Sequence, residues 1–126
     1  MVTFDGAGGG SGYSPCKMMN EWCLPTVVME SILYGILDKL TKEGMELPHV
    51  AITGGFATED QVYKALALGA DAVLIARPFV TAVYGAGADG VAAYTAQLGN
   101  ELADTMRLCG APALDAITRD MVRVIK

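Results

Sequence analysis

The chain has 126 residues, is 52% hydrophobic and carries a formal net charge of −5. This is enough sequence for one domain with a real core, and the composition excludes a disordered or fibrous protein. The acidic balance argues against a nucleic-acid partner, which requires a basic face. No apolar run approaches the ~18–20 residues of a membrane span, so no membrane partner is expected.

The beginning of the chain predicts a strand, a glycine-rich loop and a helix. The run "MVTF" is apolar and β-prone and ends at Asp5. The stretch "GAGGGSGYSP" (residues 6–15) follows, and its glycines cost backbone entropy on folding, so a stable protein should have a use for them. A helix is predicted over residues 25–40, with Gly44 as its stop signal.

A second strand and helix come next. The run "HVAIT" (residues 49–53) reads as a strand and is followed directly by a glycine pair. The next helix is predicted to begin at a capping box formed by Thr58 and Gln61 and to end at Gly69.

The last part of the chain predicts a third strand and two further helices. Residues 71–75 ("DAVLI") form the strand, and "ARPF" follows it. The segment "GAGADG" (residues 85–90) is predicted to be a linker before a helix over residues 91–109, and a short helix over residues 118–126 ends the chain. One face of the long helix is predicted to comprise Val91, Thr95, Leu98, Leu102, Met106 and Cys109.

The order of these elements predicts the fold class. Short, continuously apolar strands that alternate with helices indicate an α/β protein, here three βα units with parallel strands and covered sheet faces. In such units the ligand-binding loops follow the carboxyl ends of the strands. All three predicted strand ends carry unusual sequences, namely the glycine run, "TGGFATED" and "ARPF".

Two of these loops predict an anion site. Gly54 and Gly55 allow close approach of a ligand to the backbone, and the capped helix that follows offers N–H groups and a positive dipole end. Arg77 follows the next strand, and we expect it within reach of the same anion. The plain alternative, a tight turn and a solvated arginine, is equally open on the pattern alone. The glycine run fits neither a dinucleotide fingerprint nor a P-loop.

Two longer segments resemble a known family. The segment "DGAGGGSGYSPCKMMNEWCLPT" resembles the loop and helix after the sixth strand of the FMN-binding domain of glutamate synthases. The segment "AITGGFATEDQVYKALALGADAV" resembles the seventh-strand region of that family, which many flavin barrels share, including α-hydroxy-acid oxidases and type 2 isopentenyl-diphosphate isomerases. The resemblance covers Val2 to Pro78, and the tail from "ARPF" onward looks closer to the latter two groups.

The resemblance implies a cofactor, a site and a place in a larger fold. It implies that the cofactor is FMN. It also implies that the chain is part of a (β/α)8 TIM barrel, with its three strands equivalent to strands 6–8. Residues 1–126 would then be a single domain that forms the C-terminal portion of that barrel. A missing N-terminal half or a second copy of the chain would then be its partner. The residues implied at the cofactor are Gly9, Gly10 and Ser11 at the barrel mouth, and Gly54, Gly55, Ala76 and Arg77 at the phosphate.

The reaction implied is the formation of glutamate from 2-oxoglutarate and glutamine-derived ammonia, with the 126-residue chain inactive alone. No metal is expected, because the cysteines that hold an iron–sulfur cluster in glutamate synthases have no counterpart in "VTAVYGAGADG". Two alternatives stay open. One is a non-catalytic phosphate-binding or assembly module, and the other is part of an α-hydroxy-acid oxidase or isomerase barrel.

The remaining polar residues identify no catalytic group. The single histidine, His49, enters a strand at the end away from the predicted site, so a structural or exposed role is expected. The odd cysteine count predicts a reduced, cytoplasmic protein in which Cys16, Cys23 and Cys109 are buried small hydrophobes.

Overall fold

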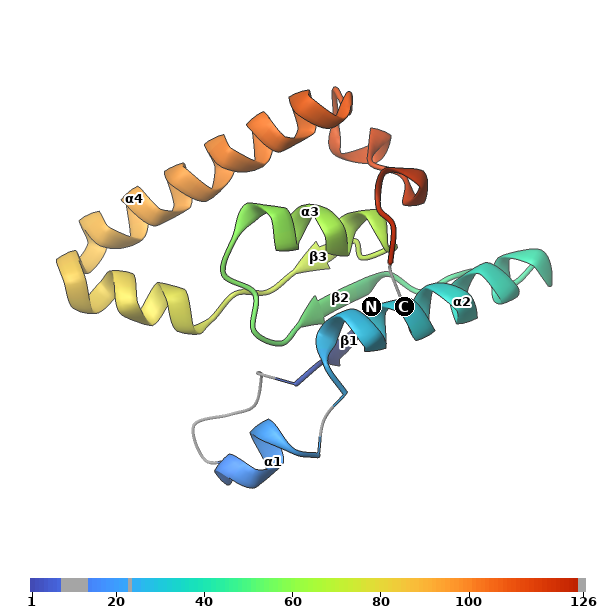
Figure 1. Cartoon of the computed structure of the whole chain (residues 1–126), viewed down its shortest axis with the longest axis horizontal. Coiled ribbons are helices and arrows are strands. Elements are labelled where there is room, and N and C mark those ends of the chain that lie inside the picture. The colour runs from blue at the N-terminus through green and yellow to red at the C-terminus, as the bar shows by residue number, and fades with distance from the viewer. Residues whose placement is uncertain (8–13, 23, 125–126) are drawn as a thin grey trace.

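A computed structural model of the chain describes residues 1–7, 14–22 and 24–124. Its sheet contains β1 (Val2–Asp5), β2 (Val50–Thr53) and β3 (Ala72–Val73) in that spatial order. All pairings are parallel. This confirms the predicted α/β class with three parallel strands (Figure 1).

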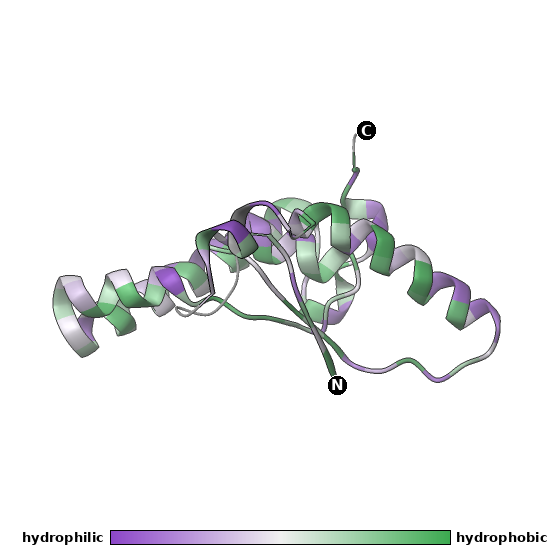
Figure 2. Cartoon of the chain, turned by 90° about the horizontal axis from the view of Figure 1, so that it is seen from below, coloured by the Kyte–Doolittle hydropathy of each residue, from purple (hydrophilic) through white to green (hydrophobic). Residues whose placement is uncertain are grey.

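Two helices connect the strands and close the main core. α2 (Thr26–Lys42) follows β1, and α3 (Glu59–Ala67) follows β2. β2 is the central strand, and its residues Val50 and Ile52 are at most 1% exposed. Apolar colour runs along the strands as well as along the helix faces (Figure 2). The core cluster of the sheet with α2 and α3 contains Leu33, Val50, Ile52, Phe56, Ala65 and Ala70.

The longest helix is α4 (Arg77–Cys109), and it is interrupted once. Ala86 and Gly87 have non-helical backbone angles, and Gly87 has a φ of +56°. The two halves of α4 therefore change direction relative to each other, as the yellow and orange ribbons show (Figure 1). The predicted linker over residues 85–90 is wrong as a six-residue segment. Only these two residues leave the helix, because the alanines around them favour helical backbone.

The second half of α4 packs on α3 and on the C-terminal turns. This packing forms a second core cluster made by Tyr63, Ala67, Ala111 and Ile117, with Leu102 and Met106 packed against it. The predicted apolar face is confirmed at Val91, Leu98, Leu102 and Met106, which are partly buried. It is wrong at Thr95 and Cys109, which are exposed, and Tyr94 occupies the face instead.

Three short elements complete the described chain. α1 (Cys16–Asn20) precedes α2, and two 3-10 turns, η1 (Leu114–Ala116) and η2 (Arg119–Met121), follow α4. The predicted helix over residues 118–126 is reduced to η2 within the described residues, since Val122 already has extended backbone angles.

The exposure of the cysteines and the length of the helices can be compared with the expectations from sequence. Cys16 and Cys109 are exposed, so the prediction of buried cysteines is wrong for both, and Cys23 lies outside the described residues. Within the part of the chain that the structure describes, no helix is long and apolar enough to cross a membrane.

Candidate functional site

A cleft of about 710 Å³ lies at the carboxyl ends of the three strands. Asp5 at the end of β1, Thr53 at the end of β2 and Leu74 just after β3 all line it. This is the edge of a parallel sheet at which α/β proteins bind their ligands. The loop after β2 supplies Gly55, Phe56 and Ala57 to the same cleft, and Ala76 with the first two residues of α4, Arg77 and Pro78, supplies the part that follows β3.

The two predicted glycines have different surroundings. Gly54 and Gly55 have φ values of +125° and +84°, which residues with a side chain rarely adopt. Gly54 is buried, and a Cβ there would lie 2.7 Å from the backbone N and O of Gly6 and from Thr26 Oγ1. The Thr26 hydroxyl donates a 2.6 Å hydrogen bond to the Gly54 carbonyl. Gly54 therefore joins the ends of β1 and β2, whereas Gly55 is exposed and lines the cleft.

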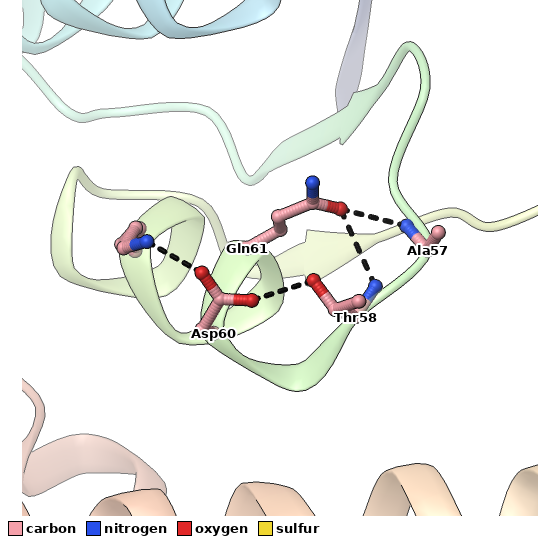
Figure 3. Close-up of polar contacts among 5 residues, drawn as sticks. Ala57, Thr58, Asp60 and Gln61 are labelled. Atoms are coloured by element: carbon pink, nitrogen blue, oxygen red, sulfur yellow. Dashed lines mark hydrogen bonds and ion pairs between the residues drawn. The ribbon is translucent and has the colours of Figure 1, made fainter.

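The start of α3 is closed by its own side chains. The predicted capping box is present, and Gln61 Oε1 accepts hydrogen bonds from the backbone N–H groups of Ala57 and Thr58 at 2.8 and 3.3 Å (Figure 3). Thr58 Oγ1 donates to Asp60 Oδ1 at 2.5 Å. Hydrogen bonds from Lys64 and Thr58 hold the pKa of Asp60 below its usual range, so this residue stays negatively charged.

The backbone N–H groups of Ala57 and Thr58 already donate to Gln61, so an anion at this cleft must be bound by other donors. No other described residue accepts a hydrogen bond from the backbone N–H of Gly55 or Phe56. Arg77, the first residue of α4, adds a guanidinium to the lining. The predicted meeting of the two loops is thus observed for Gly55, Ala76 and Arg77, while Gly54 lies behind them.

Tyr94 is a cleft residue that the sequence analysis missed. Its hydroxyl donates a 2.8 Å hydrogen bond to the Ala57 carbonyl, and its ring meets Phe79 edge-on with centroids 4.9 Å apart. Burial raises the pKa of Tyr94, so the phenol stays protonated as a donor at neutral pH. The only sequence signal was its position on the same helical face as Val91 and Leu98.

The other predicted residues are placed as follows. Gly9, Gly10 and Ser11 lie outside the described residues. His49 is exposed at the amino end of β2, where its Nδ1 lies 3.3 Å from Asp71 Oδ1, so it is remote from the cleft as expected. Among the described residues, no group of three or more His, Cys, Asp or Glu side chains could hold a metal ion.

The sequence and curated relatives identify a family. Residues 31–124 match the family described as FMN-dependent dehydrogenase. A peroxisomal (S)-2-hydroxyacid oxidase of Arabidopsis thaliana is 38% identical over 96 residues, which are 76% of this chain and 24% of that protein. A second such oxidase from the same plant is 47% identical over 74 residues, covering 59% and 20% of the two chains. The chain thus spans about a quarter or less of the length of these curated relatives.

Solved structures give the same relation. A flavocytochrome b2 variant with sulfite bound superposes with a TM-score of 0.68 at 29% identity, over 73% of this chain and 24% of that chain. A mandelate oxidase with benzoyl-formic acid gives a TM-score of 0.61 at 36% identity, over 71% and 26%. The structural neighbours are FMN-dependent TIM-barrel enzymes, and three parallel βα units are part of such a barrel.

The comparisons correct one part of the sequence-based resemblance. They support the relation to α-hydroxy-acid oxidases and give no evidence for glutamate synthase specifically. The seventh-strand segment, with its glycine pair and "KALALGAD" helix, and the tail from "ARPF" onward are the parts of the sequence whose resemblance extended to these oxidases. The chain belongs to the FMN-dependent dehydrogenase family, whose cofactor is FMN.

Proposed function

We propose that this chain forms the phosphate end of an FMN site in an enzyme that oxidises small (S)-2-hydroxy acids. Family membership supports the cofactor. The names of matched relatives, among them (S)-2-hydroxyacid oxidase, L-lactate oxidase of Roseobacter and 4-hydroxymandelate oxidase of Amycolatopsis orientalis, support the substrate class. The single observation that carries the proposal is the cleft that brings Gly55, Ala76 and Arg77 together at the carboxyl edge of the sheet.

The chemistry of these groups fits a phosphate. A phosphate monoester offers strong acceptor oxygens and negative charge, which backbone N–H groups and a guanidinium complement. Gly55 has no side chain to keep a ligand from its backbone, and Arg77 supplies a planar, permanently charged donor set. FMN, when bound, supplies the two-electron acceptor that the conversion of a 2-hydroxy acid to a 2-oxo acid requires.

The chain's own residues hold the turn that meets the phosphate. The Thr26 hydroxyl fixes the carbonyl of Gly54, and the Tyr94 hydroxyl fixes the carbonyl of Ala57, so the turn between them is tied at both ends. A turn held in this way presents its N–H groups without reorganisation when the anion arrives. We assign no catalytic base to the chain, and of the described residues that line the cleft only Asp5 is acidic.

A pair of ligands tests this role of Arg77. FMN and riboflavin share the ring system, and only FMN has a phosphate. We expect Arg77→Ala to weaken FMN binding by about tenfold or more, the loss of one charge-assisted contact, and to leave riboflavin binding unchanged. Flavin fluorescence titrations of the full chain measure both constants. Arg107→Ala is the matched control, because Arg107 is exposed near the far end of α4 and pairs with Asp104. Equal loss of FMN and riboflavin affinity, or no loss, would reject the phosphate role.

The alternative assembly role rests on the exposed sheet. Among the described residues, β1 and β3 each pair with β2 alone, and Val2 and Leu74 are 43% and 47% exposed. Unpaired strand edges and exposed apolar side chains favour association. We therefore propose that further strands of a barrel, or a second copy of this chain, cover these edges. Light scattering that finds only a 13.2 kDa monomer, without binding of an apolar dye, would contradict both versions.

The cytoplasmic location drawn from the cysteines also stays a proposal. Two of the matched plant oxidases are named as peroxisomal. Fractionation of cells that express the natural protein distinguishes the two compartments.

A further inference from the structure

A second cavity, of about 460 Å³, lies between α2, α3 and the segment that follows η2. Its apolar wall includes Val27, Leu68, Val122 and Val124. Gly55 and Phe56 line both this cavity and the cleft at the strand ends, whereas Gly54 lines this cavity alone of the two. Its volume lies within the range of about 300–1,000 Å³ that is typical of small-molecule sites.

Glu30 on α2 lines this cavity and is a charged residue buried among apolar side chains. It is 4% exposed and is the only charged residue among those described that is buried. Its Oε1 has no hydrogen-bond partner among the described residues. A buried carboxyl without a partner is destabilising, so each such group calls for an explanation. Burial raises the pKa of Glu30 to about 7, so near neutrality the group exists in both protonation states.

Two basic residues, both exposed, also contribute to the lining of the cavity. Lys64 of α3 and Arg123 after η2 both line it. Lys64 already pairs with Asp60 at 2.5 Å, whereas no ion pair joins Arg123 to another described residue. The cavity therefore combines an unsatisfied carboxyl, an available guanidinium and an aliphatic wall.

This combination selects a ligand chemistry. A carboxylate on the ligand complements Arg123, a hydroxyl or ammonium group donates to Glu30, and an aliphatic body covers the valine and leucine side chains. A simple amine would meet the positive charge of Lys64 and Arg123 without compensation. A simple carboxylate would leave Glu30 without a donor.

We propose that this cavity is a second binding site, distinct from the strand-end cleft, for a small aliphatic carboxylate that carries a hydrogen-bond donor beside its carboxylate. Two classes share this chemistry, namely 2-amino acids and 2-hydroxy acids. Binding at this site requires neither FMN nor the proposed oxidation, so the proposal can be tested independently of the proposed function.

Four probes with one branched body test the proposal. L-Valine and L-2-hydroxyisovalerate have both groups, isovalerate lacks the donor, and isobutylamine lacks the carboxylate. Each is titrated into the full 126-residue chain while backbone amide chemical shifts are recorded. We expect saturable chemical-shift changes at Val27 and Val122 with valine or with 2-hydroxyisovalerate. The two incomplete probes should bind with an affinity at least about tenfold lower, because each lacks one charge-assisted contact. The stronger of the first two identifies the ligand class.

Variants locate the contacts. Glu30→Leu replaces the buried carboxyl, whose Oε1 has no partner, with an apolar side chain, so the variant should fold at least as well as the parent chain. We expect it, and Arg123→Gln, to lose the saturable shifts, while Glu46→Gln, a change at an exposed glutamate, keeps them. The proposal is overturned if no probe saturates, if all four bind alike, if Glu30→Leu binds as the parent does, or if the shifts appear only around Arg77 and Tyr94. That last pattern would assign the ligand to the cleft.

Discussion

The two ends of the same three strands differ in how their polar groups are used. At the amino ends, Asp71 Oδ2 accepts a 2.7 Å hydrogen bond from the Val50 N–H, and the Asp71 N–H donates to the Val50 carbonyl at 2.8 Å. His49 adds a further contact to the same carboxylate. At the carboxyl ends, the loops open into a cleft that contains Arg77 and the backbone of Gly55.

This difference separates stability from binding within one small sheet. Groups that are satisfied locally hold strands together but have nothing left to offer a ligand. Groups at a loop that is held from behind can meet a ligand without reorganising. The comparison leads to predictions for both ends of the sheet.

The largest effect on stability is expected at Gly54. Gly54→Ala forces a side chain onto a residue with a φ of +125° and brings a Cβ to 2.7 Å from the Gly6 backbone. We expect the free energy of unfolding to fall by about 2–4 kcal/mol from strain and overpacking combined. Urea denaturation measures it.

Gly99→Ala is the matched control for this change. Gly99 lies inside α4, and an added Cβ would meet nothing within 4 Å. Since alanine favours helix over glycine, this variant should be more stable by up to about 1 kcal/mol. If Gly54→Ala were as harmless as Gly99→Ala, the account of the turn as a fixed junction would be wrong.

At the amino end, Asp71→Ala leaves the buried N–H of Val50 without its carboxylate partner. We expect a loss of about 1–2 kcal/mol in the free energy of unfolding, against almost none for the exposed Asp115→Ala, and no change in FMN affinity. If Asp71→Ala lowered FMN affinity and left the free energy of unfolding unchanged, the assignment of stability to the amino end and of binding to the carboxyl end would be wrong.

The same carboxylate predicts a pH dependence. The hydrogen bond from Val50, with a further contribution from His49, lowers the pKa of Asp71 in the folded state. Its stabilisation is therefore complete above the unfolded pKa of about 3.9 and is lost as the pH falls toward the folded value. Asp71→Asn should flatten this acid limb in denaturation curves recorded at successive pH values, and an unchanged limb would show that other carboxyls cause it.

The smallest effect is expected at Tyr94. Tyr94→Phe keeps the edge-on contact with Phe79 but removes the hydrogen bond to the Ala57 carbonyl. We expect a loss of about 0.5–1.5 kcal/mol and a weaker hold on the turn, seen as faster amide exchange at Ala57, whose N–H donates to Gln61 Oε1. Tyr84→Phe, at a residue that is 90% exposed, should change neither quantity.

Local features of this fold were predictable from sequence because neighbouring residues determine them. The capping box of Thr58 and Gln61 and the glycine stop at Gly69, whose φ is +99°, are set within a few residues, and both are present. The meeting of Gly55 with Arg77 followed from a general rule about parallel strands. The glycine loop at residues 8–13 lies outside the described residues, so its predicted role stays a prediction.

Features that depend on distant contacts were missed or wrong. Tyr94 reaches Ala57 across 37 positions, and it does so only because α4 changes direction at Ala86 and Gly87. A sequence pattern of alanines and glycines does not distinguish that single break from a linker. Glu30 falls within an amphipathic helix and looks like a surface residue until α3 and the C-terminal segment are placed beside it.

The most direct test of the central claim is a map of backbone amide chemical shifts on addition of FMN to the chain. If the carboxyl end is the phosphate site, the largest changes will fall on Gly55, Phe56 and Arg77, will vanish in Arg77→Ala, and will not be reproduced by riboflavin. The amides of Val50 and Asp71 at the opposite end should stay unchanged. Changes that centre on the amino end, or that riboflavin produces equally at Gly55, would contradict the account.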